Sequence, residues 1–236
     1  MANYSADAHA AQMKLLRQLL LSSSCKFSEL VKATGLTSDH ANFHIKQLVE
    51  AGLVKHVLKT HGQYELTQHG KDYANHMDTD EFVMEKQPKL SVVLDIVNVD
   101  GRHLQQERLK QPYYGYWGRP TGKIRAGETM IEAAARELKE ETGLEADLTV
   151  LGFYHKLDYD VDGNFLEDKY FCVVRGVNPR GEMLLESDGQ RNEWLTNEEF
   201  LAKEKNFGGI EELQSDIDAG RPFVFEKKFV YPYEDY

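Results

Sequence analysis

Cysteine is almost absent from this sequence of 236 residues, which contains only Cys25 and Cys172. Two cysteines so far apart do not form the disulfide framework of a small secreted domain, so a reducing cytoplasm is the expected setting. No stretch is apolar over the roughly 20 residues that a membrane-spanning helix needs, and the N-terminus lacks a signal-peptide pattern. The sequence therefore predicts a cytoplasmic protein without a membrane partner.

Basic residues are not in excess either. The sequence has 39 acidic and 28 basic residues, which give a net charge of −11. The charge is unevenly spread. Residues 1–80 hold eight basic and eight acidic residues, so the rest of the chain carries the whole negative charge. This break in composition predicts two domains, 1–78 and 89–236, joined by a polar linker at 79–88 that ends in Pro88.

The segment from Gly122 to Leu144 carries the clearest local pattern. Thr129 and Glu132 have the form of a capping box that starts a helix near Met130, and Gly143 is suited to end that helix. The apolar stripe of the predicted helix consists of Ile131, Ala134, Ala135 and Leu138.

Three glutamates share another side of this predicted helix, namely Glu137, Glu140 and Glu141. Their mutual repulsion calls for a positive charge among them, and clustered carboxylate oxygens suit Mg²⁺ or Mn²⁺ better than zinc. Arg136 precedes Glu140 by one helical turn and can orient that carboxylate. A solvated acidic helix face is the alternative that the helix by itself leaves open.

The spacing around the helix resembles the Nudix box, Gly-x5-Glu-x7-Arg-Glu-U-x-Glu-Glu-x-Gly-U, in which U is aliphatic. Every specified position is matched, by Gly122, Glu128, Arg136, Glu137, Leu138, Glu140, Glu141, Gly143 and Leu144. The resemblance extends more loosely over about residues 87–236. It implies an α/β sandwich in which a mixed sheet lies between helices.

The resemblance also implies an enzyme that uses Mg²⁺ or Mn²⁺ to hydrolyse a nucleoside diphosphate linked to some group X. The implied catalytic residues are Arg136, Glu137, Glu140 and Glu141, and the implied metal ligands are these three glutamates with Gly122 and Glu128. The general base stays open among Glu137, Glu186 and Glu193.

Candidate substrate contacts are Tyr114, Trp117, Tyr159 and Glu193. Aromatic residues in the position of the cluster at 113–117 are more often core or dimer contacts than substrate contacts. Strands are expected near 90–99, 103–109, 149–157 and 169–177, and a helix is expected at 196–203. The aromatic tail 223–236 is expected to pack on the sheet or on a second subunit.

The first 78 residues show a different order of elements. Helical spacing and capping residues predict helices at 9–22, 28–34 and 37–51, then a hairpin with strands at 53–58 and 63–66, then a helix at 67–77. Residues 35–55 and the later Tyr64, Leu66, Thr67 and Gly70 resemble the winged helix-turn-helix of ArsR/MarR-type regulators, over about residues 8–78.

That resemblance implies a mainly α domain whose third helix enters the major groove of DNA. It directs Ser38, Asp39, His40, Asn42 and Lys46 toward DNA, and it places Lys55, Lys59 and His61 on the wing. The zero net charge of residues 1–80 is weak for a DNA-binding domain, so a domain that only dimerises is an alternative. A homodimer is expected, with the apolar first and last helices as its seam.

Three functions fit both resemblances. The first is an active hydrolase that also regulates transcription in response to a nucleotide. The second is a regulator that senses a ligand without consuming it. The third is a hydrolase whose N-terminal domain serves dimerisation alone.

Overall fold

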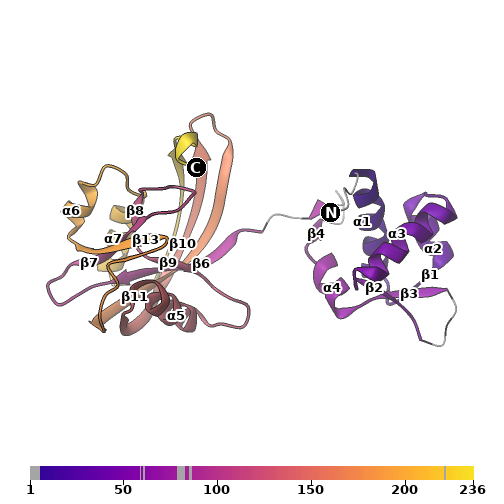
Figure 1. Cartoon of the computed structure of the whole chain (residues 1–236), viewed down its shortest axis with the longest axis horizontal. Coiled ribbons are helices and arrows are strands. Elements are labelled where there is room, and N and C mark those ends of the chain that lie inside the picture. Colours follow the sequence, from indigo (N-terminus) through magenta and orange to yellow (C-terminus); the bar gives the residue numbers. More distant parts are fainter. Residues whose placement is uncertain (1–5, 59, 61, 79–82, 85–86, 221) are drawn as a thin grey trace. The chain divides into compact units, whose positions relative to one another are not determined.

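The computed structural model describes residues 6–236 except 59, 61, 79–82, 85–86 and 221. The chain divides into two compact units, Met1–Gln87 and Pro88–Tyr236, which are drawn in Figure 1. Most of the predicted linker at 79–88 lies outside the described residues. Within the described ranges, no helix is both long enough and apolar enough to cross a bilayer.

The described part of the first unit contains four helices, a three-stranded antiparallel sheet and a short pair of strands at Met77–Asp78 and Val83–Met84. The helices are α1 (Ala6–Leu20), α2 (Phe27–Thr34), α3 (Ser38–Glu50) and α4 (Gln68–Ala74). The sheet has the order β1-β3-β2, formed by Cys25–Lys26, Gln63–Leu66 and Val54–His56. The short strand β1 was not predicted, because two residues carry no periodicity that a sequence pattern could reveal.

Capping residues set the bounds of these helices. Thr37 accepts a hydrogen bond from the backbone N–H of His40 at the start of α3, as the sequence predicts. Gly35 ends α2 with a φ of 69°, which glycine adopts without strain. The predicted last helix is too long at its C-terminal end, because α4 stops at Ala74 and Met77 belongs to a two-residue strand, β4 (Met77–Asp78).

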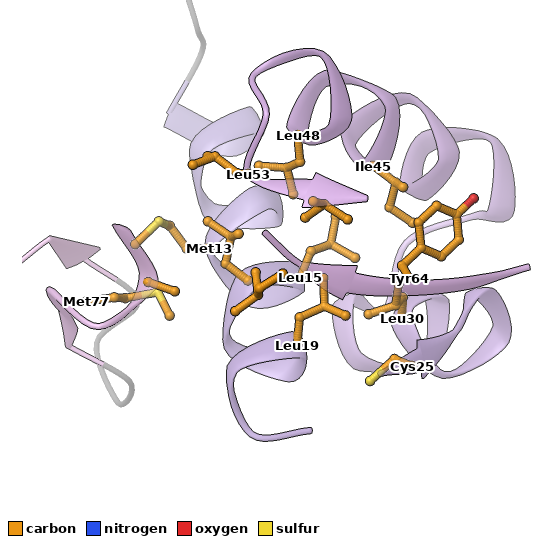
Figure 2. Packing of buried hydrophobic residues seen from close by; sticks show 14 residues of the cluster. Met13, Leu15, Leu19, Cys25, Leu30, Ile45, Leu48, Leu53, Tyr64 and Met77 are labelled. Carbon is orange, nitrogen blue, oxygen red and sulfur yellow. The ribbon is translucent and has the colours of Figure 1, made fainter. Parts of the chain in front are cut away.

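The core of this unit forms between α1 and the strands, and Figure 2 shows its side chains converging there. Leu15 of α1 and Leu30 of α2 are fully buried, and Ile45 and Leu48 of α3 pack against the same cluster. Each such side chain contributes roughly 1.5–3 kcal/mol through burial. The opposite side of α3 is consequently left at the surface.

The second unit is built on a five-stranded mixed sheet of order β14-β10-β11-β6-β9. These strands span Phe223–Tyr231, Glu145–Asp160, Phe165–Arg180, Lys89–Ile96 and Thr121–Lys123. Helix α5 (Met130–Thr142) shares a core with Val92 and Leu94 of β6, whereas α7 (Ile210–Asp218) shares another core with Val93. Neighbouring strand residues point to opposite faces, so the two helices cover the two faces, and the predicted α/β sandwich is confirmed.

A second sheet has the order β12-β13-β7-β8. Its strands are Glu186–Ser187, Gln190–Leu195, His103–Arg108 and Trp117–Gly118. The turn at Asp100-Gly101 is present, but the strands on its two sides enter different sheets and pair with each other through a bridge between Val97 and His103. Thr196 caps a short helix after β13, α6 (Asn197–Leu201).

Helix α5 has the predicted bounds. Thr129 and Glu132 form the capping box, and Gly143 ends the helix with a φ of 74°. The predicted apolar stripe is partly wrong, because Ile131 and Ala135 are exposed. The residues that face the sheet are Ala133, Ala134, Leu138 and Thr142.

The strands β10 and β11 are longer than predicted and form one extended hairpin. The C-terminal tail adds β14 in parallel to β10, with Gly152 opposite Phe223 and Asp160 opposite Tyr231. The prediction that the tail packs on the sheet is thereby confirmed. A final 3-10 helix, Tyr233–Asp235, follows this strand.

His155 of β10 connects three strands and makes stability depend on pH. Its ring nitrogens lie 2.5 Å from Glu226 and 2.9 Å from Asp168. Burial alone lowers the pKa of His155, but the hydrogen bonds to Glu226 and Asp168 outweigh burial and raise it. A histidine whose folded-state pKa is raised stabilises fully below the unfolded pKa of about 6.5 and loses this effect as pH rises through the folded pKa.

We therefore expect the loss of unfolding free energy caused by His155→Gln to be larger at about pH 5.5 than at about pH 8.5. Urea denaturation of both proteins at the two pH values measures this difference. His69→Gln, at an exposed position of α4, is the control and should change little at either pH. Equal losses for His155→Gln at both pH values would contradict the expectation.

Candidate functional site

A cavity of about 590 Å³ opens in the second unit. Strands β6, β9, β10 and β11 contribute to its walls, together with the start of α7. Its basic lining residues are Lys89, Arg108, Lys110, Arg119, Lys123, Arg125, Lys156 and Lys169. Its acidic lining residues are Glu137, Glu141 and Glu167. A chain with a net charge of −11 thus concentrates cations in one cavity, which favours an anionic ligand.

Three of these cations have no carboxylate partner among the described ion pairs, namely Arg108, Lys110 and Lys123. The guanidinium of Arg108 donates to the backbone carbonyls of Pro112 and Gln111, which fixes its position without neutralising it. The charges of Lys110 and Arg108 lower the pKa of Glu141, which lines the same cavity. These cations are available to phosphate oxygens.

Glu137 reaches the cavity because the residue opposite it is glycine. A Cβ placed on Gly122 would lie 2.0 Å from Cγ and Cδ of Glu137. Gly122 belongs to β9 and pairs with Val92 of β6, so its backbone is fixed by the sheet. The sheet therefore leaves room for the Glu137 side chain in this position only when residue 122 has no side chain.

Arg136 holds the carboxylates beside the cavity. Its guanidinium lies 2.6 Å from Glu128, 2.6 Å from Glu137 and 3.2 Å from Glu140, and it donates to the carbonyl of Lys123 at 2.9 Å. The hydrogen bond from Arg136 lowers the pKa of Glu128 to about 2. The orienting role predicted for Arg136 thus extends to two more glutamates.

Glu141 is a partly buried carboxylate whose charge Gln106, Lys110 and Arg108 compensate only in part. Burial raises its pKa, and the charge of Glu137 raises it further, against the opposing effect of a hydrogen bond from Gln106 at 3.3 Å. An ionised carboxylate in this position is destabilising by itself, and a cation would remove the penalty.

The four glutamates predicted as metal ligands do not form a preorganised metal site; they are Glu128, Glu137, Glu140 and Glu141. Across the described part of the chain, no three His, Cys, Asp or Glu side chains gather closely enough to enclose a metal ion. Glu137 and Glu141 line the cavity, whereas Glu140 is 51% exposed and lies beside Arg136 and Arg125. The donor set nevertheless fits Mg²⁺ or Mn²⁺, because it consists of hard oxygens and includes Glu141, whose charge is only partly compensated.

The deep part of the cavity contains buried charges that the sequence did not reveal. Lys156 lies 2.5 and 2.6 Å from the two oxygens of Asp158. Burial lowers the pKa of Lys156 to about 8, although Asp158 opposes this shift. Four aromatic rings surround the ammonium, from Tyr113, Phe207, Phe229 and Tyr231.

A second buried group lies at Arg119. Its guanidinium is 3.1 Å from the fully buried Asp95, which also accepts from His103 at 2.7 Å and from Arg175. Burial would raise the pKa of Asp95, but these partners outweigh burial and lower it. The sequence offers a hint only for Asp95, which is a charged residue in the mostly apolar strand β6.

The predicted substrate contacts lie elsewhere, since none of Tyr114, Trp117, Tyr159 and Glu193 lines the cavity. Tyr114 is 55% exposed, whereas Trp117 is 7% exposed and packs with Leu195 and Phe200. Stacking of Trp117 on a base would require this core to open.

The two late glutamates are likewise outside the cavity. Glu193 pairs with Lys203 at 2.8 Å, and Glu186 pairs with Arg191 at 3.1 Å. Tyr159 forms an edge contact with Phe165 near the end of the long hairpin. Of the predicted general bases, Glu137 is therefore the one that the structure places at the cavity.

The residues predicted to face DNA on α3 are mostly at its surface. Ser38, Asp39, His40 and Lys46 are exposed, and Asn42 is half-buried. Lys55 of β2 is exposed and pairs with Glu65 at 3.0 Å. Lys59 and His61 lie outside the described residues.

Comparison with known proteins identifies the family of this chain. The model of the NUDIX domain matches residues 87–213, which is more than half of the chain. The ADP-ribose pyrophosphatase of Methanocaldococcus jannaschii is 33% identical over 101 residues, which cover 42% of this chain and 57% of that protein. The chain thus spans little more than half the length of this relative.

Two further matches, one curated protein and one solved structure, cover 46% and 65% of this chain. The asymmetrical bis(5'-nucleosyl)-tetraphosphatase of Mus musculus is 29% identical over 111 residues, covering 46% of this chain and 72% of that protein. The NUDIX domain of Shewanella oneidensis NrtR, solved in complex with ADP ribose, has a TM-score of 0.48 at 17% identity. That alignment covers 65% of this chain and 99% of the solved one. On the extent of the domain match, the chain belongs to the Nudix family.

Proposed function

We propose that this protein is a Mg²⁺- or Mn²⁺-dependent pyrophosphohydrolase that cleaves a nucleoside diphosphate linked to a group X. The products are a nucleoside monophosphate and phosphorylated X. One observation carries the proposal: Glu137 and Glu141 line a cavity in which eight lysines and arginines gather. The names of two relatives, an ADP-ribose pyrophosphatase and an asymmetrical bis(5'-nucleosyl)-tetraphosphatase, support it.

The metal ligands in this proposal are Glu137, Glu140 and Glu141, with the carbonyl of Gly122 and with Glu128 directly or through water. When bound there, Mg²⁺ or Mn²⁺ neutralises phosphate charge and lowers the pKa of the attacking water.

The other residues of the site bind and orient the substrate. Arg108, Lys110 and Lys123 hold the phosphate oxygens, because these cations lack a carboxylate partner among the described ion pairs. Arg136 orients the carboxylates through its ion pairs with Glu128, Glu137 and Glu140. Glu137 is the favoured proton acceptor, since it is the predicted general base that lines the cavity.

A panel of substrates tests this function. The protein is incubated with Mg²⁺ and, separately, with ADP-ribose, diadenosine polyphosphates, NADH and 8-oxo-dGTP, and release of nucleoside monophosphate or phosphate is measured. Turnover of at least one compound, lost in Glu140→Gln, is the expected result. No turnover of any compound would favour the non-catalytic, ligand-sensing regulator instead.

For the first unit we propose a winged helix-turn-helix that binds DNA, so that a nucleotide derivative controls transcription. The order of helices and strands supports this, as does the polar side of α3 that faces away from the core. Selection of bound sequences from a random DNA library by the full-length protein tests it. Enrichment that Asn42→Ala removes is expected. A failure to enrich any sequence would favour a unit that only dimerises.

A further inference from the structure

The C-terminal strand β14 is the free edge of the five-stranded sheet. It pairs with β10 on one side, and no described strand pairs with its other side. It is nine residues long, and its outward-facing Val224 and Val230 are 82% and 64% exposed. A long edge strand with exposed apolar side chains invites pairing with another strand.

The sequence of β14, Phe-Val-Phe-Glu-Lys-Lys-Phe-Val-Tyr, matches itself when read in the opposite direction. In an antiparallel pair of two copies centred on Lys227, Phe225 lies opposite Phe229, and Val224 lies opposite Val230. Glu226 then lies opposite Lys228 twice, once on each side of the two-fold axis. Opposite charges facing each other across antiparallel strands are stabilising, whereas like charges are destabilising.

The two faces of the strand agree with this register. Phe223, Phe225 and Phe229 pack against the core that α7 covers, whereas Val224, Glu226, Lys228 and Val230 are exposed. Each residue in the symmetric register meets a residue of its own face, because the side-chain period of a strand is two. A shift of the centre to Glu226 would place two glutamates opposite each other.

Lys227 lies on the two-fold axis and faces Lys227 of the second copy. These two like charges repel each other unless each is compensated. Lys227 forms an ion pair with Glu212 of α7, which compensates this charge within each chain. We propose that β14 joins two copies of this protein into a symmetric dimer, in which the two five-stranded sheets continue across the antiparallel β14 pair. An isologous contact of this kind closes on itself and leaves neither β14 strand unpaired on its outer side.

Reciprocal charge variants of the full-length protein test this interface. In Glu226→Lys alone, lysines face lysines at both sites, and in Lys228→Glu alone, glutamates face glutamates. A mixture of the two variants restores two opposite-charge pairs in the heterodimer. Sedimentation equilibrium is expected to give twice the chain mass of 27.1 kDa for the unchanged protein, the chain mass for each variant, and twice the mass for the equimolar mixture.

Glu226→Lys also removes a partner of His155, whereas Lys228→Glu leaves that contact in place, so circular dichroism of each variant checks that the fold persists. Glu198→Lys and Lys32→Glu, at exposed positions of α6 and α2, are matched controls and should stay dimeric. Three results would overturn the proposal: a monomeric unchanged protein, dimers in both single variants, or a mixture of the folded variants that stays monomeric.

Discussion

Glutamine in place of Glu141 is expected to remove most of the hydrolase activity and to make the folded protein more stable. In the proposed function this carboxylate holds the metal, so kcat/KM should fall by roughly 10²–10³-fold, the usual effect of removing one group that stabilises charge in the transition state. Burial and the charge of Glu137 raise the pKa of Glu141, which means that ionised Glu141 is destabilised in the folded protein. At neutral pH a neutral amide avoids this penalty, so the free energy of unfolding should rise by about 1 kcal/mol.

Glu145→Gln is the matched control for this prediction. Glu145 follows α5, pairs with Lys139 at 3.0 Å, and has a pKa lowered by the hydrogen bond from that lysine. Its replacement should leave hydrolysis unchanged and should not stabilise the protein. Steady-state kinetics and urea denaturation, both without and with Mg²⁺, measure the two effects. Unchanged hydrolysis in Glu141→Gln, or a lower stability of this variant without metal, would contradict the assigned role.

Sequence alone predicts the parts of this site whose determinants are local. The capping box at Thr129, the end of α5 at Gly143 and the spacing of the glutamates all lie within one helix and its flanks. The contact between Gly122 and Glu137 joins residues 15 positions apart, and the match to the Nudix box indicates both of them. The helix and the placement of Glu137 and Glu141 beside one another therefore follow from a short segment.

The basic cavity and the aromatic assignments depend on contacts between distant segments. Lys156 and Lys89 meet in one cavity because β10 and β6 flank β11, an order that strand periodicity does not specify. Trp117 precedes the box in the sequence, yet Leu195 and Phe200 bury it. Which aromatic residue faces a ligand is decided by such partners, and sequence spacing near the box holds no information about them.

Alanine in place of Gly122 is expected to separate catalysis from folding. The new Cβ would lie 2.0 Å from Cγ and Cδ of Glu137 and 2.4 Å from one of its oxygens. These atoms belong to a flexible side chain that can rotate away, so the loss of stability should stay within about 1 kcal/mol. The rotation removes Glu137 from the cavity, and a displacement of this size in a metal site should lower kcat/KM by about 10²-fold.

Gly163→Ala is the matched control, because it should produce the opposite combination. Gly163 has a φ of 83° and no atom within contact distance of an added Cβ, so alanine there strains the backbone without touching the site. We expect it to cost about 1 kcal/mol of stability and to leave kcat/KM unchanged. Two results would contradict this explanation: an unfolded Gly122→Ala variant, or a variant that hydrolyses the substrate at the original rate. In either case, the close approach of Glu137 to β9 would not explain the glycine at this position. A folded Gly122→Ala variant without activity would show that glycine is required for the position of the Glu137 carboxylate and not for the stability of β9.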